Sequence, residues 1–206
     1  MWADHFSRAG RWTDAACALV DAAQSALAGH DLDAVLALVA EVRTLCAKAS
    51  AEARPVPDRT LGLAALLEAE VWLWRGKPLR GKESAAEAMR LLSQGSADWF
   101  RAAGEYGTAL GRVGARDELG VWIADTAAVR PAPDARVPWA VAFARVAVHL
   151  YYANDFATPD RVLAAVERGL ADAPLDARVE ARLAGARAAR ASAAAAYDLV
   201  ESESLR

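Results

Sequence analysis

The sequence is poor in several residue types, and each shortage narrows the possibilities. Of 206 residues, only two are cysteines and three are histidines. Two cysteines are too few for a disulfide framework or a zinc site, and the histidines are scattered, so we expect buried reduced thiols and no metal site. The only isoleucine is Ile123, whereas alanine is very abundant. Because alanine loses the least on helix formation and β-branched residues lose side-chain freedom, this balance predicts an all-α protein.

Long hydrophobic runs are also missing. The longest, from Trp139 to Ala153, is interrupted by Arg145 and His149 and falls short of the ~20 residues needed to span a bilayer. The first ten residues lack the basic and apolar regions of a signal peptide, so we expect a cytoplasmic protein. Apolar residues make up 55% of the chain and the net charge is −3, which favours a folded protein that binds neither membranes nor nucleic acid.

Caps, prolines and glycines divide the chain into about ten helices with short turns and no plausible strand. The expected helices are 2–9, 13–28, 31–49, a hairpin of two over 59–93, and then 97–113, 116–129, 137–153, 158–173 and 174–197. The expected N-cap residues are Thr13, Asp31, Asp58 and Thr158. Two proline-containing loops separate sub-blocks 1–49, 58–129 and 137–206 of what we interpret as a single helical-repeat domain, 1–206.

The turns repeat a pattern in which a glycine or its substitute is followed five positions later by a small residue or a helix starter. The pairs are Gly10 with Ala15, Gly29 with Ala34, Gly76 with Gly81, Gly114 with Leu119, and Asn154 with Pro159. A tight turn favours a residue that accepts positive φ, and the close approach of two helices beyond it favours a small side chain. We therefore expect antiparallel helical hairpins.

With these turns the chain resembles the tetratricopeptide repeat family, whose units of about 34 residues are helix pairs with small, large apolar and glycine residues at fixed positions. The matching residues are Ala69, Trp72, Gly76, Gly81 and Ala88 in one hairpin, Gly107, Leu110 and Gly114 in the next, and Phe143, Ala147 and Leu150 in the third. The turns at 76, 114 and 154 are 38 and 40 residues apart. This spacing is similar to the divergent, maltose-activator-type repeat regions of large bacterial Ser/Thr kinases and multidomain signalling regulators. The resemblance implies a right-handed superhelix of stacked hairpins.

In that family the first helix of each pair lines a concave surface, and its positions carry over to a candidate partner-binding groove. The groove residues would be Glu70, Trp74, Arg101, Glu105, Thr108, Arg112, Arg145 and Tyr152. Aromatic and arginine side chains suit peptide recognition. Trp74 lies about 200° around its helix from Trp72, which we expect in the core together with Trp12 and Trp122. The alternative is that the groove residues are ordinary exposed or inter-repeat residues.

One string could be mistaken for an active site. Gly76 to Lys82 reads G-x-x-x-x-G-K, the beginning of a phosphate-binding P-loop. Glu83 stands where the motif needs a hydroxyl, Pro78 removes a loop amide, and the preceding residues have a helical pattern, so we interpret the string as a repeat turn. No G-x-S-x-G or H-E-x-x-H motif occurs. We predict no catalytic, cofactor-binding or metal-binding residues and no enzyme activity.

The sequence thus predicts a non-catalytic protein–protein interaction scaffold or regulatory repeat module, a fragment of a larger bacterial signalling protein. Its partner would be a protein or peptide, with self-association as a second mode. One alternative is a small-molecule sensor domain of a multidomain regulator, which would need an enclosed polar pocket between helices. A further alternative is a nucleotide-binding regulatory domain that uses Lys82.

Overall fold

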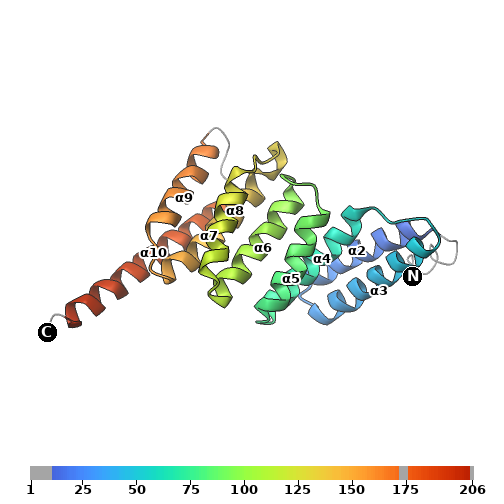
Figure 1. Ribbon diagram of the computed structural model, residues 1–206, viewed down its shortest axis with the longest axis horizontal. Coiled ribbons are helices and arrows are strands. Elements are labelled where there is room, and N and C mark those ends of the chain that lie inside the picture. The colour runs from blue at the N-terminus through green and yellow to red at the C-terminus, as the bar shows by residue number, and fades with distance from the viewer. Residues whose placement is uncertain (1–10, 172–175, 205–206) are drawn as a thin grey trace. The chain divides into compact units, whose positions relative to one another are not determined.

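The computed structural model describes residues 11–171 and 176–204, and within these ranges the chain forms α-helices, one short 3-10 helix and no strand (Figure 1). The helices are α2 (Trp12–Ala28), α3 (Leu32–Ala51), α4 (Asp58–Trp74), α5 (Pro78–Leu91), α6 (Ala97–Val113), α7 (Arg116–Ala128), η1 (Pro133–Ala135), α8 (Arg136–Tyr152), α9 (Ala157–Gly169) and α10 (Ala177–Ser204). The predicted all-α fold of about ten helices is confirmed. The expected helix 2–9 lies outside the described residues.

The chain divides into two compact units, Met1–Gln94 and Gly95–Arg206. The boundary falls between α5 and α6, inside the sub-block 58–129, and each of the two proline-containing loops lies within one unit. Prolines end a helix but do not prevent the next helix from packing back, as α4 does on α3 and α8 on α6. The superhelix stays a prediction.

Unit 1 consists of the hairpins α2–α3 and α4–α5, and α4 also packs on both helices of the first hairpin (Figure 1). A bidentate ion pair joins its last three helices. Arg43 of α3 donates to the two carboxylate oxygens of Glu87 on α5 at 2.9 and 2.7 Å and to Glu68 on α4 at 2.8 Å. The hydrogen bond from Arg43 lowers the pKa of Glu87. This fixes the mutual positions of α3, α4 and α5.

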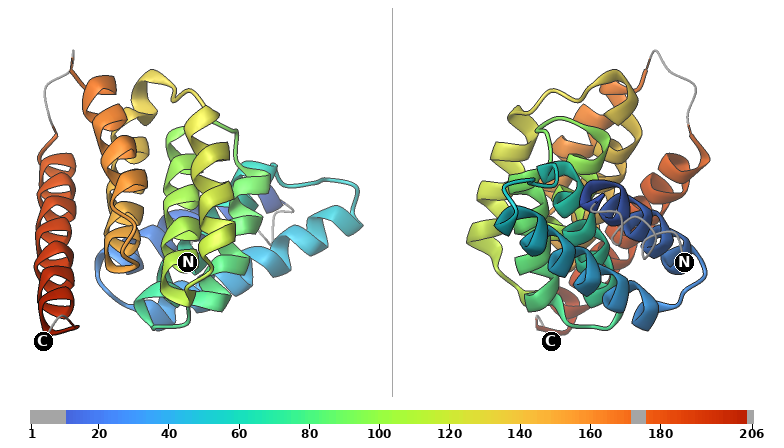
Figure 2. Two further views of the ribbon diagram at one scale, coloured as in Figure 1. Left: turned by 60° about the vertical axis from the view of Figure 1, so that its left-hand side comes forward. Right: turned by 90° about the vertical axis from the view of Figure 1, so that its right-hand side faces the viewer.

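Unit 2 is organised around α8, which packs against α6, α9 and α10 (Figure 2). A stripe of glycines on α6 lets the backbones of α6 and α8 approach closely. A Cβ at Gly107 would lie 2.7 Å from Cγ2 of Val146, and one at Gly111 would lie 2.5 Å from Cγ of His149. No real side chain sits that close, so these positions admit only glycine unless the helices move apart.

The turns have one common geometry. Gly76, Gly114 and Asn154 adopt φ of 66°, 72° and 61°, as predicted. Gly29 does not: its φ is −80°, and the left-handed residue is His30 at 62°. In each of the four turns the amide after the left-handed residue donates to a carbonyl five residues earlier, the hydrogen bond that defines the Schellman motif. His30 is the second residue after the end of α2, the place that Gly76 and Asn154 take after α4 and α8.

Several predicted caps are wrong for the same reason, a shift of one to three residues at a helix end. Asp31 caps α3 as expected, accepting from the amide of Ala34 at 3.0 Å. Thr13 and Asp58 lie inside the helices that they were expected to cap. Thr158 does too, and there Asp155 is the capping side chain, accepting from the Thr158 amide at 3.0 Å. The last helix runs to Ser204 and so continues past 197.

Candidate functional site

The end of α4 exposes one tryptophan and partly buries another. Trp74 is 71% exposed. Trp72 is only half-buried, so its expected place in the core is wrong. The core position belongs to Leu73, against which a Cβ on Gly81 would clash at 2.9 Å. Trp72 instead packs outward, with the guanidinium carbon of Arg80 4.7 Å from its ring centroid.

The turn that follows Trp74 carries basic and apolar side chains, two of which lie over Trp72. The ring centroid of His30, from the turn before α3, lies 6.1 Å from the ring centroid of Trp74. Arg75 forms an ion pair with Asp33 and also lies over Trp72, at 5.9 Å. Lys77 is exposed, and so is 65% of Leu79. We name this set the turn surface; its members are His30, Trp74, Arg75, Lys77, Leu79 and Arg80. Glu70, the other predicted groove residue of unit 1, is half-buried one helical turn before Trp74.

The six remaining groove residues lie in unit 2, on α6 and α8. Their spacing puts the α6 members on one helix face and the α8 members on one face. Glu105 is 6% exposed and accepts from both terminal nitrogens of Arg145, with Nη2 2.9 Å from Oε2. The ion pair brings the two faces together. Arg101 lies 3.5 Å from Asp98, one turn earlier on the same helix.

This face is cationic and partly buried. Burial lowers the pKa of His149, and the charges of Arg112 and Arg145 lower it further. Thr108 is buried, and its hydroxyl oxygen has no hydrogen-bond partner among the described residues. Glu105 and Thr108 therefore build the interior of unit 2 and present little surface to a partner. The sequence did not predict that His149 lies on this face, because its position follows from its packing against Gly111 of α6.

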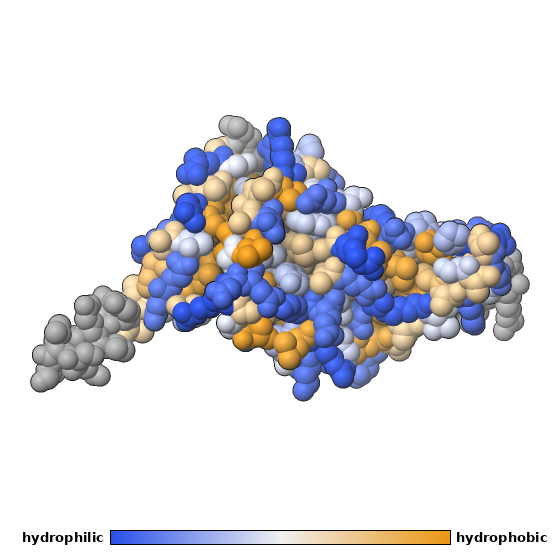
Figure 3. Space-filling model, in the orientation of Figure 1, coloured by the Kyte–Doolittle hydropathy of each residue, from blue (hydrophilic) through white to orange (hydrophobic). Residues whose placement is uncertain are grey.

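The exposed members of the predicted groove share one place in their hairpins. Trp74, Arg112 and Tyr152 each lie two residues before the left-handed residue of the turn. All three are exposed, and 64% of Tyr152 is in contact with solvent. Hydrophilic side chains cover much of the face seen in Figure 3, with apolar patches between them. Each of these three hairpins thus exposes a side chain two residues before the left-handed residue of its own turn.

The string from Gly76 to Lys82 connects two helices. A P-loop follows a strand, whereas here α4 precedes the turn and Pro78 is the first residue of α5. Cys17 and Cys46 are free thiols; Cys46 is buried as expected, whereas Cys17 is exposed, so the expected burial is wrong there. In the described ranges no three acidic, histidine or cysteine side chains are grouped to hold a metal ion. Of the helices described, none has the length and apolar character to cross a membrane.

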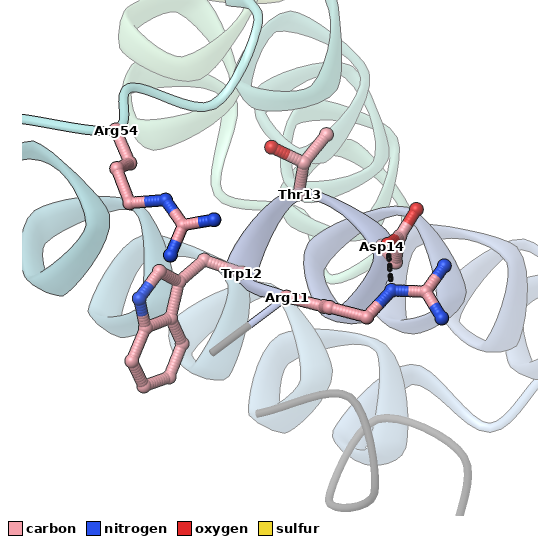
Figure 4. A pocket seen from close by; sticks show the side chains of 5 residues that line it. All are labelled: Arg11, Trp12, Thr13, Asp14 and Arg54. Carbon is pink, nitrogen blue, oxygen red and sulfur yellow. Dashed lines mark hydrogen bonds and ion pairs between the residues drawn. The ribbon is translucent and has the colours of Figure 1, made fainter. Parts of the chain in front are cut away.

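A small polar pocket of about 180 Å³ lies beside the start of α2 (Figure 4). Its lining residues are Arg11, Trp12, Thr13, Asp14 and Arg54. Trp12 was expected in the core but is half-buried, because its indole nitrogen donates to Glu52 at 2.7 Å. Arg11 donates to Asp14 at 2.7 Å. No sequence pattern predicts this pocket, because Arg54 comes from the loop after α3, far along the chain from the start of α2.

A scan against models of protein families, a search of curated proteins and a search of solved structures each found no match.

Proposed function

We propose that the chain is a non-catalytic protein–protein interaction scaffold or regulatory repeat module that binds a protein or peptide through the turn edges of its hairpins. The observation that carries this proposal is the exposure of two aromatic side chains, Trp74 and Tyr152, at the same position of two hairpins. Tryptophan and tyrosine are the residues most enriched among those that dominate binding energy at protein interfaces.

The hairpin geometry supports this role because it holds both side chains in place. Each aromatic residue is the last of its helix, and the Schellman hydrogen bonds of the turn fix the backbone directly after it. A side chain on a fixed backbone loses little conformational freedom on binding, which favours affinity. The proposal that the module belongs to a larger bacterial signalling protein, with tetratricopeptide-like repeats, rests on the sequence resemblance alone.

The test is affinity capture with the immobilised chain from a lysate of the source organism. Wild type is compared with a Trp74→Ala, Tyr152→Ala double variant and with Val121→Ala, which truncates an apolar side chain that is 61% exposed elsewhere, on α7. We expect specific partners to be retained by wild type and the Val121 variant and lost by the double variant. If the double variant captures the same proteins as wild type, the turn edges are not the binding surface.

A second candidate, a small-molecule sensor, would use the pocket beside α2, which combines an indole and two guanidinium groups but is partly open and not enclosed between helices. A thermal-shift screen with small anionic metabolites, repeated on Arg54→Ala, tests this candidate. A stabilisation that disappears in the variant would favour the sensor. The nucleotide-binding alternative is tested with MgATP in the same assay, where we expect no shift; a shift abolished by Lys82→Ala would refute the scaffold interpretation of that turn.

A further inference from the structure

The turn surface of unit 1 combines exposed apolar area with positive charge. Trp74 and Leu79 have the highest exposed fractions of the large apolar side chains in the part of the chain that is described. They lie on the two sides of a three-residue turn, one ending α4 and the other in the first turn of α5. Apolar side chains exposed together in this way mark a place where a partner removes them from water.

The chain segment that contains the turn is basic. Positions 75–82 contain four basic residues and no acidic one, although the chain as a whole has a net charge of −3. Asp33 neutralises Arg75 from the neighbouring helix, and the exposed Lys77 and Arg80 remain. The C-terminus of α4 and the N-terminus of α5 meet at this turn, so their helix dipoles offset each other and the positive potential comes from the side chains.

Two of the cations are held in place before any partner binds. The guanidinium carbons of Arg75 and Arg80 lie 5.9 and 4.7 Å from the ring centroid of Trp72. A guanidinium that stacks on an aromatic ring keeps its N–H groups at its edge, where they can bind a carboxylate in bidentate geometry. The half-buried position of Trp72, which no core function requires, therefore has a role as a platform for these arginines.

We propose that the turn surface docks an acidic peptide segment in which apolar residues alternate with carboxylates. The apolar residues would cover Trp74 and Leu79, and the carboxylates would pair with Lys77 and Arg80. This inference rests on the proposed function and names the partner chemistry of one of its surfaces. A peptide fits better than a nucleic acid, because the chain has a net negative charge and Arg75 is already paired with Asp33, which leaves few cations to bind a phosphate backbone.

The test uses a short fluorescein-labelled peptide, DEDFEDLED, and fluorescence anisotropy with the full chain. Two comparison peptides change one feature each: KRKFKRLKR reverses the charge, and DEDGEDGED removes the apolar anchors. We expect DEDFEDLED to bind tightest and its affinity to fall with added salt, since the cations are exposed. Trp74→Ala and Lys77→Glu should each weaken binding roughly 10-fold or more, as for residues at the centre of an interface.

The controls are matched substitutions in unit 2. Val121→Ala removes a comparably exposed apolar side chain, and Arg116→Glu reverses a comparably exposed charge; both should leave the affinity unchanged. Circular dichroism checks that all four variants keep their helices. The proposal is overturned if wild type does not bind DEDFEDLED, if the Trp74 and Lys77 variants bind it as wild type does, or if single-stranded DNA or phosphatidylserine-containing vesicles bind more tightly in a Trp74-dependent manner.

The result also separates this inference from the proposed function. If partner capture from the lysate depends on Trp74 while DEDFEDLED does not bind, the acidic-peptide chemistry is wrong and the scaffold function stands. If neither capture nor peptide binding depends on Trp74 or Tyr152, both proposals fail.

Discussion

Replacing Arg145 by methionine should destabilise unit 2 strongly, because it leaves a charge in the interior. Glu105 is 6% exposed, and its two carboxylate oxygens accept from the two terminal nitrogens of Arg145. Removing one partner of a buried ion pair costs about 3 to 5 kcal/mol. The Arg145 side chain is 24% exposed, so water already screens part of this interaction, and we expect the loss to lie near the lower end, about 2 to 4 kcal/mol.

The assay is urea unfolding followed by circular dichroism, with native-state hydrogen exchange in α6 and α8 to assign the loss to unit 2. The matched control is Arg187→Met, which removes an ion pair with Glu167 whose side chains are 64% and 45% exposed; it should cost less than about 1 kcal/mol. A second variant, Glu105→Leu with Arg145→Met, removes both charges and should recover much of the loss. Equal effects of Arg145→Met and Arg187→Met would refute the idea that the Glu105–Arg145 pair behaves as a buried one.

Two further predictions concern stability. Gly111→Ala should destabilise the chain by about 1 kcal/mol or more, because the new Cβ clashes with His149 and this overpacking exceeds the gain in helix propensity. Gly120→Ala, where a Cβ meets nothing within 4 Å, should stabilise the chain by up to about 1 kcal/mol. Thermal melts that rank the two variants in the opposite order would contradict the close α6–α8 packing. The lowered pKa of Glu87 means that its stabilising contribution is present above the unfolded-state pKa and is lost as the pH falls through the folded-state value. Glu87→Gln should therefore show a smaller drop in melting temperature between neutral and acid pH than wild type, and an identical drop would exclude a contribution from the Arg43 pair.

The sequence was sufficient to predict the helices, because alanine content, glycines and prolines act locally. It placed Gly76, Gly114 and Asn154 correctly, since each has a residue type that tolerates positive φ. It failed at His30, because residue type favours Gly29 for positive φ, whereas the end of α2 at Ala28 puts the second residue after the helix in the left-handed conformation. It also exchanged the roles of Trp72 and Leu73: the family pattern assigns the large apolar position by counting, whereas burial depends on where α5 begins.

The candidate site was predicted less well than the fold, and the reason lies in long-range packing. Spacing along α6 correctly put four groove residues on one face, but it could not tell that two of them, Glu105 and Thr108, would be covered by α8. That depends on the glycines of α6, which draw α8 close. The basic residues that follow Trp74 are present in the sequence, but their spacing there matches only a phosphate-binding motif and does not predict a peptide-binding surface.

The burial pattern at the helix ends explains why the turn edges can carry function. Three residues before the left-handed residue, Leu73 and Tyr151 are buried; one residue later, Trp74 and Tyr152 are exposed. The Schellman hydrogen bonds fix where each helix ends, and so they also fix which side chain faces outward. That outward position makes little contribution to the core of its unit and is free to differ between hairpins, as the arginine at 112 illustrates. Aromatic residues at such a position expose apolar area that folding does not require, which is what an interaction surface needs.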